Sequence, residues 1–408
     1  MKLDSKNVRK NFPSLNNDWI FMDNAGGSQI AGPVVSRISD YLLNSNVQLG
    51  ASYGISQLAG QRVNEAAVMI KEFINARDQS EIIIGSSTTM LLRILSISLG
   101  GTFVKDDEII VTNCDHEANI GPWMDLRKRG VIIKIWKLNP NTFRLDIEDL
   151  KNLITPRTKL VAVTHTSNIL GTLNPIKQIA EIVHKNGALI CVDGVAHAPH
   201  RLIDVQDLDA DFYAFSFYKV FGPHIAMLYG KRDKLLSIPG VNHFFITEEN
   251  IPYKFQPGSV NYELSYGILG IRDYFNSIAE DHNIIGDNFR QNAEFIYKLI
   301  ADHEEVLSSI LLNYLNSKSG VKIIGEKTFN KIERVPTISF IVEGKQSDLI
   351  TEKVDPHKIG IRYGDFYARR LIDDLGLSHS NGVVRISLVH YNTPEEIYKL
   401  IDVLDSVL

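Results

Sequence analysis

The stretch Ala188-Leu-Ile-Cys-Val-Asp193 is an apolar run of strand length that ends in a carboxylate, and Phe212-Tyr-Ala-Phe-Ser-Phe-Tyr-Lys219 is a second run that ends in an amine. Near-continuous apolar strands favour a mostly parallel sheet, because helices cover both faces of such a sheet. In open α/β sheets, ligands bind outside the carboxyl ends of the strands. Asp193 and Lys219 are therefore expected at one ligand-binding edge.

Similar runs precede these two strands and alternate with helical patterns. Strand-like runs are Glu81–Gly85, Glu108–Thr112, Val131–Trp136 and Leu160–Thr164. Apolar residues recur at helical spacing in Ser86–Leu99 and in Pro175–Lys185. This alternation predicts an α/β fold with a mostly parallel sheet covered by helices.

The C-terminal part of the chain has a different pattern. A charged helical stretch near residues 265–303 is followed by strands such as Thr337–Val342 and by a last helix from Pro394. This α+β mixture predicts a smaller second domain. We expect an N-terminal segment of residues 1–20, a large domain of residues 21–285 and a small C-terminal domain of residues 286–408.

Composition and charge narrow the class of protein. The 408 residues are 44% apolar, and 43 basic against 48 acidic residues give a net charge of −5. This balance argues against nucleic acid as a partner, because phosphate binding needs a concentrated positive field. No apolar run approaches the roughly 18 residues that span a membrane. With no secretory signal at the N-terminus and only two cysteines, we expect a cytoplasmic enzyme without a disulfide framework.

An amine and an acid at neighbouring strand ends can serve pyridoxal phosphate. Lysine forms a Schiff base with the aldehyde of this cofactor, and a carboxylate pairs with the pyridinium nitrogen, which keeps the ring an electron sink. For two isolated residues, a structural ion pair is the simpler explanation. No glycine-rich dinucleotide fingerprint and no zinc-like spacing of Cys and His competes for the site.

Asp193 and Lys219 are not isolated, because other polar residues also follow strand ends. His116 comes after the run Glu108–Thr112 and can stack on a pyridine ring or move protons, although a lone loop histidine is usually only solvated. Asn168 follows Leu160–Thr164 and can donate to a phenolic oxygen, although turn chemistry also explains it. The hydroxyls of residues 86–89 open a helix, where they either bind phosphate or only cap the helix.

With these residues in order, the chain resembles the class V aminotransferases of the cysteine desulfurase-like group, within fold type I of the pyridoxal-phosphate enzymes. The resemblance runs from about Phe21 to the end of the chain, and the order and spacing of its motifs make it specific. The stretches that carry it are Phe21-Met-Asp-Asn-Ala-Gly-Gly-Ser28, Asp115-His-Glu-Ala-Asn119, His165-Thr-Ser-Asn-Ile-Leu-Gly-Thr172, Val192-Asp-Gly194, Phe215-Ser-Phe-Tyr-Lys-Val-Phe-Gly-Pro223, Gly258-Ser-Val-Asn261, Val384-Arg-Ile-Ser-Leu388 and Tyr391-Asn-Thr393.

This resemblance implies a role for each matching residue. Lys219 carries the Schiff base and moves the Cα proton, Asp193 holds the pyridinium, and His116 stacks on the ring. Asn168 contacts the phenolic oxygen and the substrate. Thr88, Thr89 and Ser216 are implied to bind the cofactor phosphate. Ser259 is implied to bind the phosphate of the neighbouring subunit, in a homodimer with shared sites. The implied substrate-binding residues are Arg385, Arg362 and Gly26, of which Arg385 clamps the carboxylate.

The departures from the family pattern bear on the reaction. Desulfurases of this type carry a nucleophilic cysteine on the loop after an Arg-x-Gly segment, and here Tyr367 occupies that position. A phenol with a pKa of about 10 is a poor substitute for a thiolate. Tyr218 stands where histidine usually precedes the lysine, and Ala196 stands where glutamine usually contacts the cofactor. Cys114 and Cys191 are expected to be structural.

These features predict a pyridoxal-phosphate enzyme that acts on a small amino acid. We expect β-elimination, as in a C–S lyase, or transamination, in either case without a persulfide on a loop cysteine. Alternatives left open by the sequence are a desulfurase that uses Cys114, an epimerase, and a non-catalytic protein that keeps an old cofactor site. The sequence does not separate them, because one scaffold of this kind hosts many chemistries.

Overall fold

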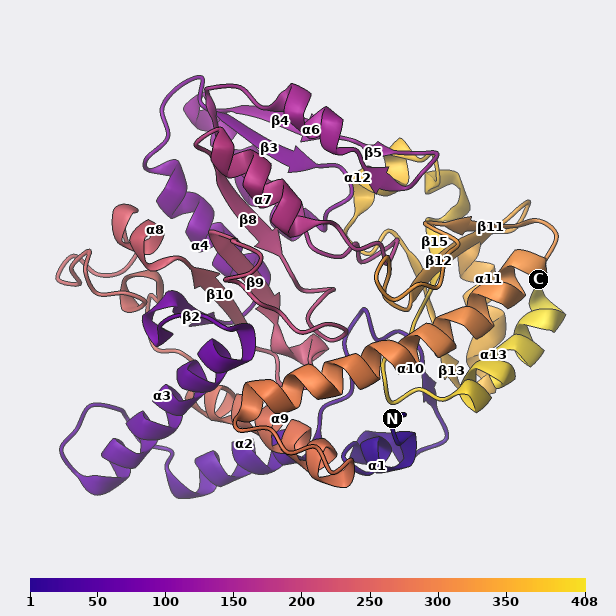
Figure 1. Cartoon of the computed structure of the whole chain (residues 1–408), viewed down its shortest axis with the longest axis horizontal. Helices are drawn as coiled ribbons and strands as arrows, with labels where there is room; N and C mark the ends of the chain where they lie inside the picture. Colours follow the sequence, from indigo (N-terminus) through magenta and orange to yellow (C-terminus); the bar gives the residue numbers. More distant parts are fainter.

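A seven-stranded sheet forms the centre of the fold in the computed structural model, which describes residues 1–408 (Figure 1). Its strand order is β2-β10-β9-β8-β7-β3-β4. All neighbouring pairs are parallel except those of β10, which is antiparallel to both of its neighbours. The strands are β2 (Ile82–Gly85), β3 (Glu108–Thr112), β4 (Ile132–Trp136), β7 (Thr158–Thr164), β8 (Leu189–Asp193), β9 (Phe212–Ser216) and β10 (Ala226–Gly230). The predicted α/β fold with a mostly parallel sheet is confirmed.

Helices cover both faces of this sheet, and side chains of each strand alternate between two hydrophobic cores. In β9, Tyr213 and Phe215 belong to the larger core, whereas Phe212 and Ala214 belong to a second core on the other face. The larger core contains α3 (Gly54–Ile74), α6 (Ile147–Leu153), α7 (Ile176–Lys185), α9 (Tyr262–Asp281) and the first half of α10 (Phe289–Ser317). The second core contains α4 (Thr88–Gly100), α5 (Gly121–Met124) and α8 (Arg232–Ser237).

Two elements of the large lobe differ from the sequence-based expectation. Strand β10 was not expected, and its antiparallel direction lets the chain return across the sheet after β9. The single helical stretch expected near residues 265–303 is two helices, α9 and α10. The break at residues 282–288 contains Asn283 with a positive φ of 53°, and Asn288 caps α10 by accepting a hydrogen bond from the backbone N–H of Gln291.

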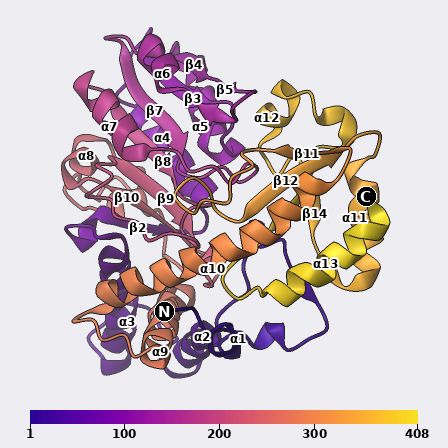
Figure 2. The same ribbon diagram turned by 45° about the vertical axis from the view of Figure 1, so that its right-hand side comes forward.

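A four-stranded antiparallel sheet forms the smaller C-terminal lobe, with the strand order β11-β12-β15-β14. Figure 2 shows this lobe beside the large one, with α10 running from one to the other. Its strands are β11 (Val321–Ile324), β12 (Thr337–Val342), β14 (Arg362–Gly364) and β15 (Val383–Ser387), and its helices are α11 (Ser347–Val354), α12 (Arg369–Asp374) and α13 (Pro394–Val407).

Helix α10 belongs to both lobes. Its first half places Phe289, Ile296 and Ile300 in the larger core, whereas Leu307 and Leu311 in its second half lie in the core of the small lobe. The expected division of the chain near residue 286 falls at the start of this helix. No helix of the fold combines the length and the hydrophobicity that crossing a membrane requires.

The N-terminal segment packs against the large lobe and then reaches the small one. Helix α1 (Ser5–Lys10) contributes Val8 to the larger core, and α2 (Gly32–Asn44) packs along α9. Between these helices, the short strand β1 (Ile20–Phe21) pairs in parallel with β13 (Ile359–Gly360) of the small lobe. Residues that follow β1 are therefore held against the C-terminal sheet.

Candidate active site

A cavity of about 510 Å³ lies at the carboxyl ends of the parallel strands. Three of its lining residues come directly from strand ends: Thr164 ends β7, Asp193 ends β8 and Ser216 ends β9. The other residues that line it are Ser87, Thr88, Thr89, His116, Ala118, Thr166, Asn168, Val195, Ala196, Tyr218 and Lys219. Seven residues expected at a cofactor site from the sequence, Thr88, Thr89, His116, Asn168, Asp193, Ser216 and Lys219, are thus brought together here.

Lys219 and Asp193 face the same cavity without pairing. Their nitrogen and oxygen atoms lie more than 4.0 Å apart, and the Lys219 amine makes no hydrogen bond to the protein. Burial lowers the pKa of Lys219 to about 8, and the neighbouring guanidinium of Arg385 acts in the same direction. Burial also raises the pKa of Asp193, whose carboxylate accepts one hydrogen bond of 2.9 Å from the backbone N–H of Val195. A structural ion pair therefore does not account for these two residues.

Hydroxyls and backbone N–H groups line the end of the cavity where α4 begins. The Thr88 and Ser216 hydroxyls lie 2.7 Å apart, which joins the first residue of α4 to the end of β9. Ser87 caps the helix by accepting a hydrogen bond of 3.2 Å from the N–H of Met90. The N–H groups of the first helical turn have no partners within the helix, so this end of the cavity suits an anion.

His116 forms part of the cavity wall as a neutral imidazole. Its Nδ1 accepts a hydrogen bond of 3.0 Å from the backbone N–H of Ala118, so the ring proton lies on Nε2. Burial lowers the pKa of His116 to about 4, and the positive charges of Lys219 and Arg385 act in the same direction. The ring is therefore uncharged at neutral pH and can pack against a flat aromatic ligand.

Asn168 joins the cavity to the small lobe. Its side-chain Nδ2 donates a hydrogen bond of 2.9 Å to the carbonyl of Phe366, and its own backbone carbonyl accepts one of 3.1 Å from Nη1 of Arg385. Because Nδ2 carries two hydrogens, one donor remains for a ligand in the cavity.

Arg385, Arg362 and Gly26, the residues expected to bind substrate, lie outside the cavity wall. Arg385 is 2% exposed, and its Nη2 donates to Oδ1 of Asp23 at 2.8 Å. The ring centroid of Phe366 lies 3.7 Å from its guanidinium carbon. Arg362 is more exposed and lies 3.9 Å from the other carboxylate oxygen of Asp23. The Arg385 guanidinium, expected from the sequence to bind a substrate carboxylate, thus already has an internal acidic partner.

Ser259 lies away from the cavity, in a separate groove of about 1060 Å³. This groove also contains Ser86, Gln256 and Asn261. The structure thus does not bring Ser259 to the phosphate end of the cavity in its own subunit, and its expected contact with a neighbouring subunit stays a prediction.

Neither cysteine reaches the cavity. Cys114 is 1% exposed, and burial together with the charge of Asp115 raises the pKa of its thiol to about 12. Cys191 is fully buried within β8, where burial raises its pKa. Tyr367 stands on the loop at the mouth of the site, with its ring centroid 5.2 Å from that of His116.

Several residues of the wall received no role from the sequence. Thr164 and Thr166 come from the same strand end as Asn168, and that placement was the available signal. Ala196 and Tyr218 were noted only as departures from the family pattern. Asp23 lies outside the wall and pairs with Arg385. Nothing in the sequence indicates this pair, because the two residues lie at opposite ends of the chain.

The fold and the site define a protein of fold type I of the pyridoxal-phosphate enzymes, with a lysine after one sheet strand and an aspartate at the end of its neighbour. Comparison with known proteins gives the family. The family model for aminotransferase class V matches residues 20–400. The chain belongs to the class V aminotransferase family, in its cysteine desulfurase-like group, as the sequence predicted.

Known relatives match over almost the whole chain. The aminotransferase-like protein FGM3 of Gibberella zeae is 45% identical over 99% of this chain and 98% of its own length. The cysteine desulfurase-like protein ustD of Aspergillus flavus is 34% identical over 100% of this chain and 91% of its own. A solved cysteine desulfurase of Thermococcus onnurineus superposes with a TM-score of 0.88 at 26% identity, covering 100% of this chain and 98% of its own.

Members of this family depend on pyridoxal phosphate, and the cavity fits that cofactor. The unpaired Lys219 amine suits its aldehyde, and the Asp193 carboxylate has a free oxygen for a ring N–H. The start of α4, with Thr88 and Ser216, suits its phosphate.

Capture of pyridoxal phosphate by the cofactor-free chain should accelerate as the pH rises through about 8. The neutral amine is the nucleophile, and Lys219 loses its proton at a pKa of about 8. Stopped-flow absorbance between about pH 6 and pH 10 at constant ionic strength measures this rate. A rate that stays flat or falls across that range would contradict the assignment of Lys219.

Proposed function

We propose that the protein is a pyridoxal-phosphate-dependent lyase that removes a substituent from Cβ of a small amino acid, without forming a persulfide on its own chain. One observation carries this proposal: the cavity that holds the unpaired Lys219 and Asp193 contains no thiol. When bound, pyridoxal phosphate supplies an aldehyde that joins an amine and a ring that accepts the electrons of a bond broken at Cα.

Lys219 would hold the cofactor through its Nζ, and the same nitrogen would take the Cα proton once the substrate amine has replaced it. A pKa of about 8 suits both tasks, because the amine gains and loses a proton near neutral pH. Asp193 would keep a proton on the ring nitrogen. Its buried carboxylate has no other cation within 4.0 Å, so its charge is available to that N–H.

The remaining wall residues would position the ligand. His116, neutral and fixed by its bond from Ala118, would cover one face of the ring, and the free donor of Asn168 would bind its phenolic oxygen. Thr88, Thr89 and Ser216 would bind the phosphate. Arg385, with Arg362 and Gly26 nearby, would receive the substrate carboxylate. Loss of the Cα proton to Lys219 would allow the substituent to leave Cβ with its electron pair, and addition of one water would give a 2-oxo acid and ammonia.

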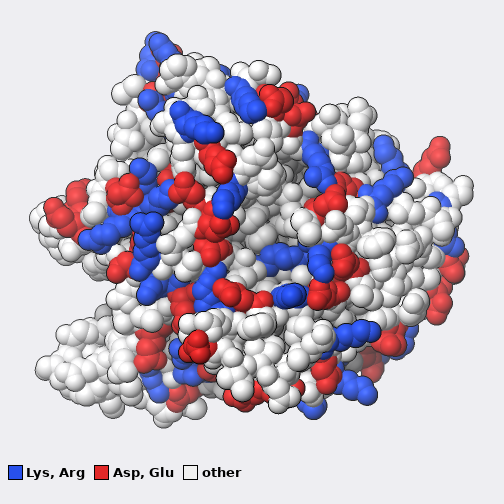
Figure 3. Space-filling model, viewed as in Figure 1, with Lys and Arg blue, Asp and Glu red and all other residues white.

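The surface supports a homodimer as part of the same proposal. Figure 3 shows that the lobe at its lower left, where the chain passes from α2 to α3, is almost free of charged side chains. The exposed apolar residues of this region are Leu42, Leu43, Tyr53, Ile55 and Leu58. A second copy that covers this region would shield these side chains from water. Ser259 lies outside the cavity of its own subunit, which is also what we expect of a residue that contributes to the active site of a neighbouring subunit.

Product analysis with cysteine-free variants tests the reaction. The holoprotein and its C114S/C191S double variant are supplied with L-cysteine and with other amino acids that carry a leaving group on Cβ. We expect both proteins to release a 2-oxo acid, ammonia and the free leaving group at similar rates, since both thiols are buried. Mass spectrometry of the intact chain should show no added sulfur.

Two results would contradict this proposal. Sulfur on Cys114, or loss of turnover in the C114S/C191S variant while its cofactor stays bound, would favour a desulfurase. Conversion of the amino acid without release of ammonia would favour transamination.

A further inference from the structure

Asp23 and Arg385 are held in register by the same strand of the small lobe. Asp23 forms an isolated parallel bridge with Ser387, two residues after Arg385 on β15. The next residue, Asn24, is 2% exposed, and its Nδ2 donates to the carbonyl of Ser387 at 2.9 Å. The N–H of Ala25 donates to the Ser387 hydroxyl at 2.8 Å. The backbone beside Asp23 is therefore fixed, and only its side chain is free to rotate.

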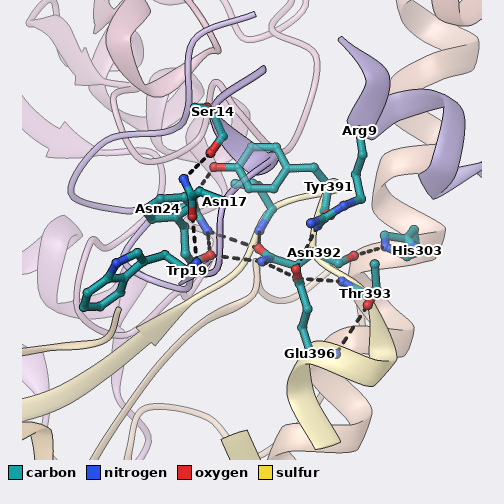
Figure 4. A network of polar contacts seen from close by, with 12 residues as sticks. Arg9, Ser14, Asn17, Trp19, Asn24, His303, Tyr391, Asn392, Thr393 and Glu396 are labelled. Carbon is teal, nitrogen blue, oxygen red and sulfur yellow. Dashed lines mark hydrogen bonds and ion pairs between the residues drawn. The ribbon is translucent and has the colours of Figure 1, made fainter. Parts of the chain in front are cut away.

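Figure 4 shows the network that holds this backbone. In this network Asn24 accepts a hydrogen bond from the Tyr391 hydroxyl, and its Nδ2 donates to Oδ1 of Asn392 at 3.1 Å. Asn392 in turn donates to Glu396 at 3.0 Å, and Arg9 donates to the same glutamate at 2.8 Å. The N-terminal segment and the start of α13 thus fasten the Asp23 loop to the small lobe.

The carboxylate of Asp23 stands between two guanidinium groups. Its Oδ1 accepts from Arg385 at 2.8 Å, and its Oδ2 lies 3.9 Å from Nη1 of Arg362. A Cβ on Gly26 would lie 2.9 Å from Oδ2, so glycine at that position leaves the carboxylate room. The Asp23 side chain is 30% exposed, whereas that of Arg385 is 2% exposed. Asp23 therefore covers Arg385 on the side where solvent reaches the pair.

Apart from its bond to Asp23, the Arg385 guanidinium is shielded from solvent. Nη1 donates to Asn168, the ring of Phe366 covers its face, and Nε is buried without a partner. The only acidic partner of Arg385 is Asp23. A carboxylate that approaches Arg385 from the side that Asp23 covers must therefore compete with Asp23 for the guanidinium.

We propose that Asp23 is an internal stand-in for the substrate carboxylate, which leaves Arg385 for Arg362 when the substrate binds. This inference rests on the proposed role of Arg385 in carboxylate binding and makes Asp23 a positioning residue for it. Each guanidinium keeps an anionic partner throughout the exchange, so no charge is left unpaired in the buried part of the site. The affinity for substrate then depends on two changes together: the ion pair that Arg385 forms with the substrate, and the transfer of Asp23 from Arg385 to Arg362.

Binding of propionate to the holoprotein and to the cofactor-free chain, followed by saturation-transfer NMR, tests the exchange. Propionate has the carboxylate but no amine to react, and propionamide is the uncharged control probe. In D23N we expect propionate to bind about tenfold more tightly, because the competing anion is gone. D23E, which restores the charge, should return the affinity toward that of the wild type. In D273N, which breaks the remote Arg37–Asp273 pair of 2.7 Å, the affinity should stay unchanged.

Variants of Arg362 provide a second test of the exchange. Its side chain is 58% exposed, so R362Q should fold normally. We expect R362Q to weaken propionate binding, because Asp23 then has no second guanidinium to pair with when it leaves Arg385. The D23N/R362Q double variant should bind as tightly as D23N alone, since the two effects share one cause.

Three outcomes would overturn the exchange. These are unchanged or weaker binding in D23N, unchanged or tighter binding in R362Q, and an equal effect of R362Q with and without Asp23, which would make Arg362 a direct ligand. The proposed reaction fails separately, through absent cofactor absorbance or absent products, and propionate binding to the cofactor-free chain still tests Asp23 in that case.

Discussion

Replacing Lys219 with alanine is expected to remove the visible absorbance of the bound cofactor and to reduce turnover by at least about 10⁴-fold. The amine is the one group in the cavity that can join the aldehyde, and in the proposed function the same nitrogen moves the Cα proton. Its loss therefore removes two functions at once. Absorbance spectra of the purified variant and single-turnover kinetics with added cofactor measure both effects.

A second buried lysine provides the control. Lys254 is 1% exposed, lies outside the cavity and donates to Glu248 at 2.9 Å. K254A should lose stability but keep the absorbance band in the fraction that folds. An unaltered band in K219A would refute the assignment of the cofactor site.

Replacing Asp193 with asparagine should lower turnover by about 10²–10³-fold while the cofactor stays bound. The amide keeps the shape of the side chain and its bond from Val195, but it has no charge to hold a proton on the ring nitrogen. Without that charge, the ring of the bound cofactor would be a weaker acceptor for the electrons of a bond broken at Cα. The measurement is turnover per bound cofactor, since the phosphate contacts and Lys219 remain in place.

Asp211 is a matched control for this change. It is 1% exposed and lies beside the opposite, amino-terminal end of β9, where it accepts a hydrogen bond of 2.9 Å from the N–H of Ile190. D211N should lower the melting temperature without changing turnover per bound cofactor. If D193N kept full turnover, the ring nitrogen would need no charged partner and the proposed role of Asp193 would fall.

The sequence predicted the sheet well because buried parallel strands are continuous apolar runs. The run Glu108–Thr112 has the bounds that the structure shows for β3, and the runs that end in Asp193 and Lys219 contain β8 and β9. Four residues of the candidate site, His116, Asn168, Asp193 and Lys219, could be grouped for the same reason, since parallel strands carry their carboxyl ends to one edge. Family resemblance added Ser216 and gave Thr88 and Thr89 a phosphate-binding role, which the residues alone left open between phosphate binding and helix capping.

Other features depend on contacts between distant segments, which the pattern of one segment does not encode. Asp23 and Arg385 lie near opposite ends of the chain, so the spacing of residues within one segment does not predict their pairing. The apolar run that forms β10 does not show whether the strand is parallel or antiparallel. The break between α9 and α10 depends on the positive φ of Asn283 and on the cap at Asn288.

The sharing of α10 between the two hydrophobic cores limits how this enzyme can be rebuilt. In a chimera that takes its C-terminal lobe from a relative, α10 also comes from that relative. The first half of this helix must then pack into the larger core of the present chain. A junction at residues 282–288 transfers all of α10 with the C-terminal lobe. A junction between Ile300 and Leu307 instead joins two halves of α10 from different proteins. For the same reason both lobes should melt in a single calorimetric peak, with neither surviving alone as a soluble fragment.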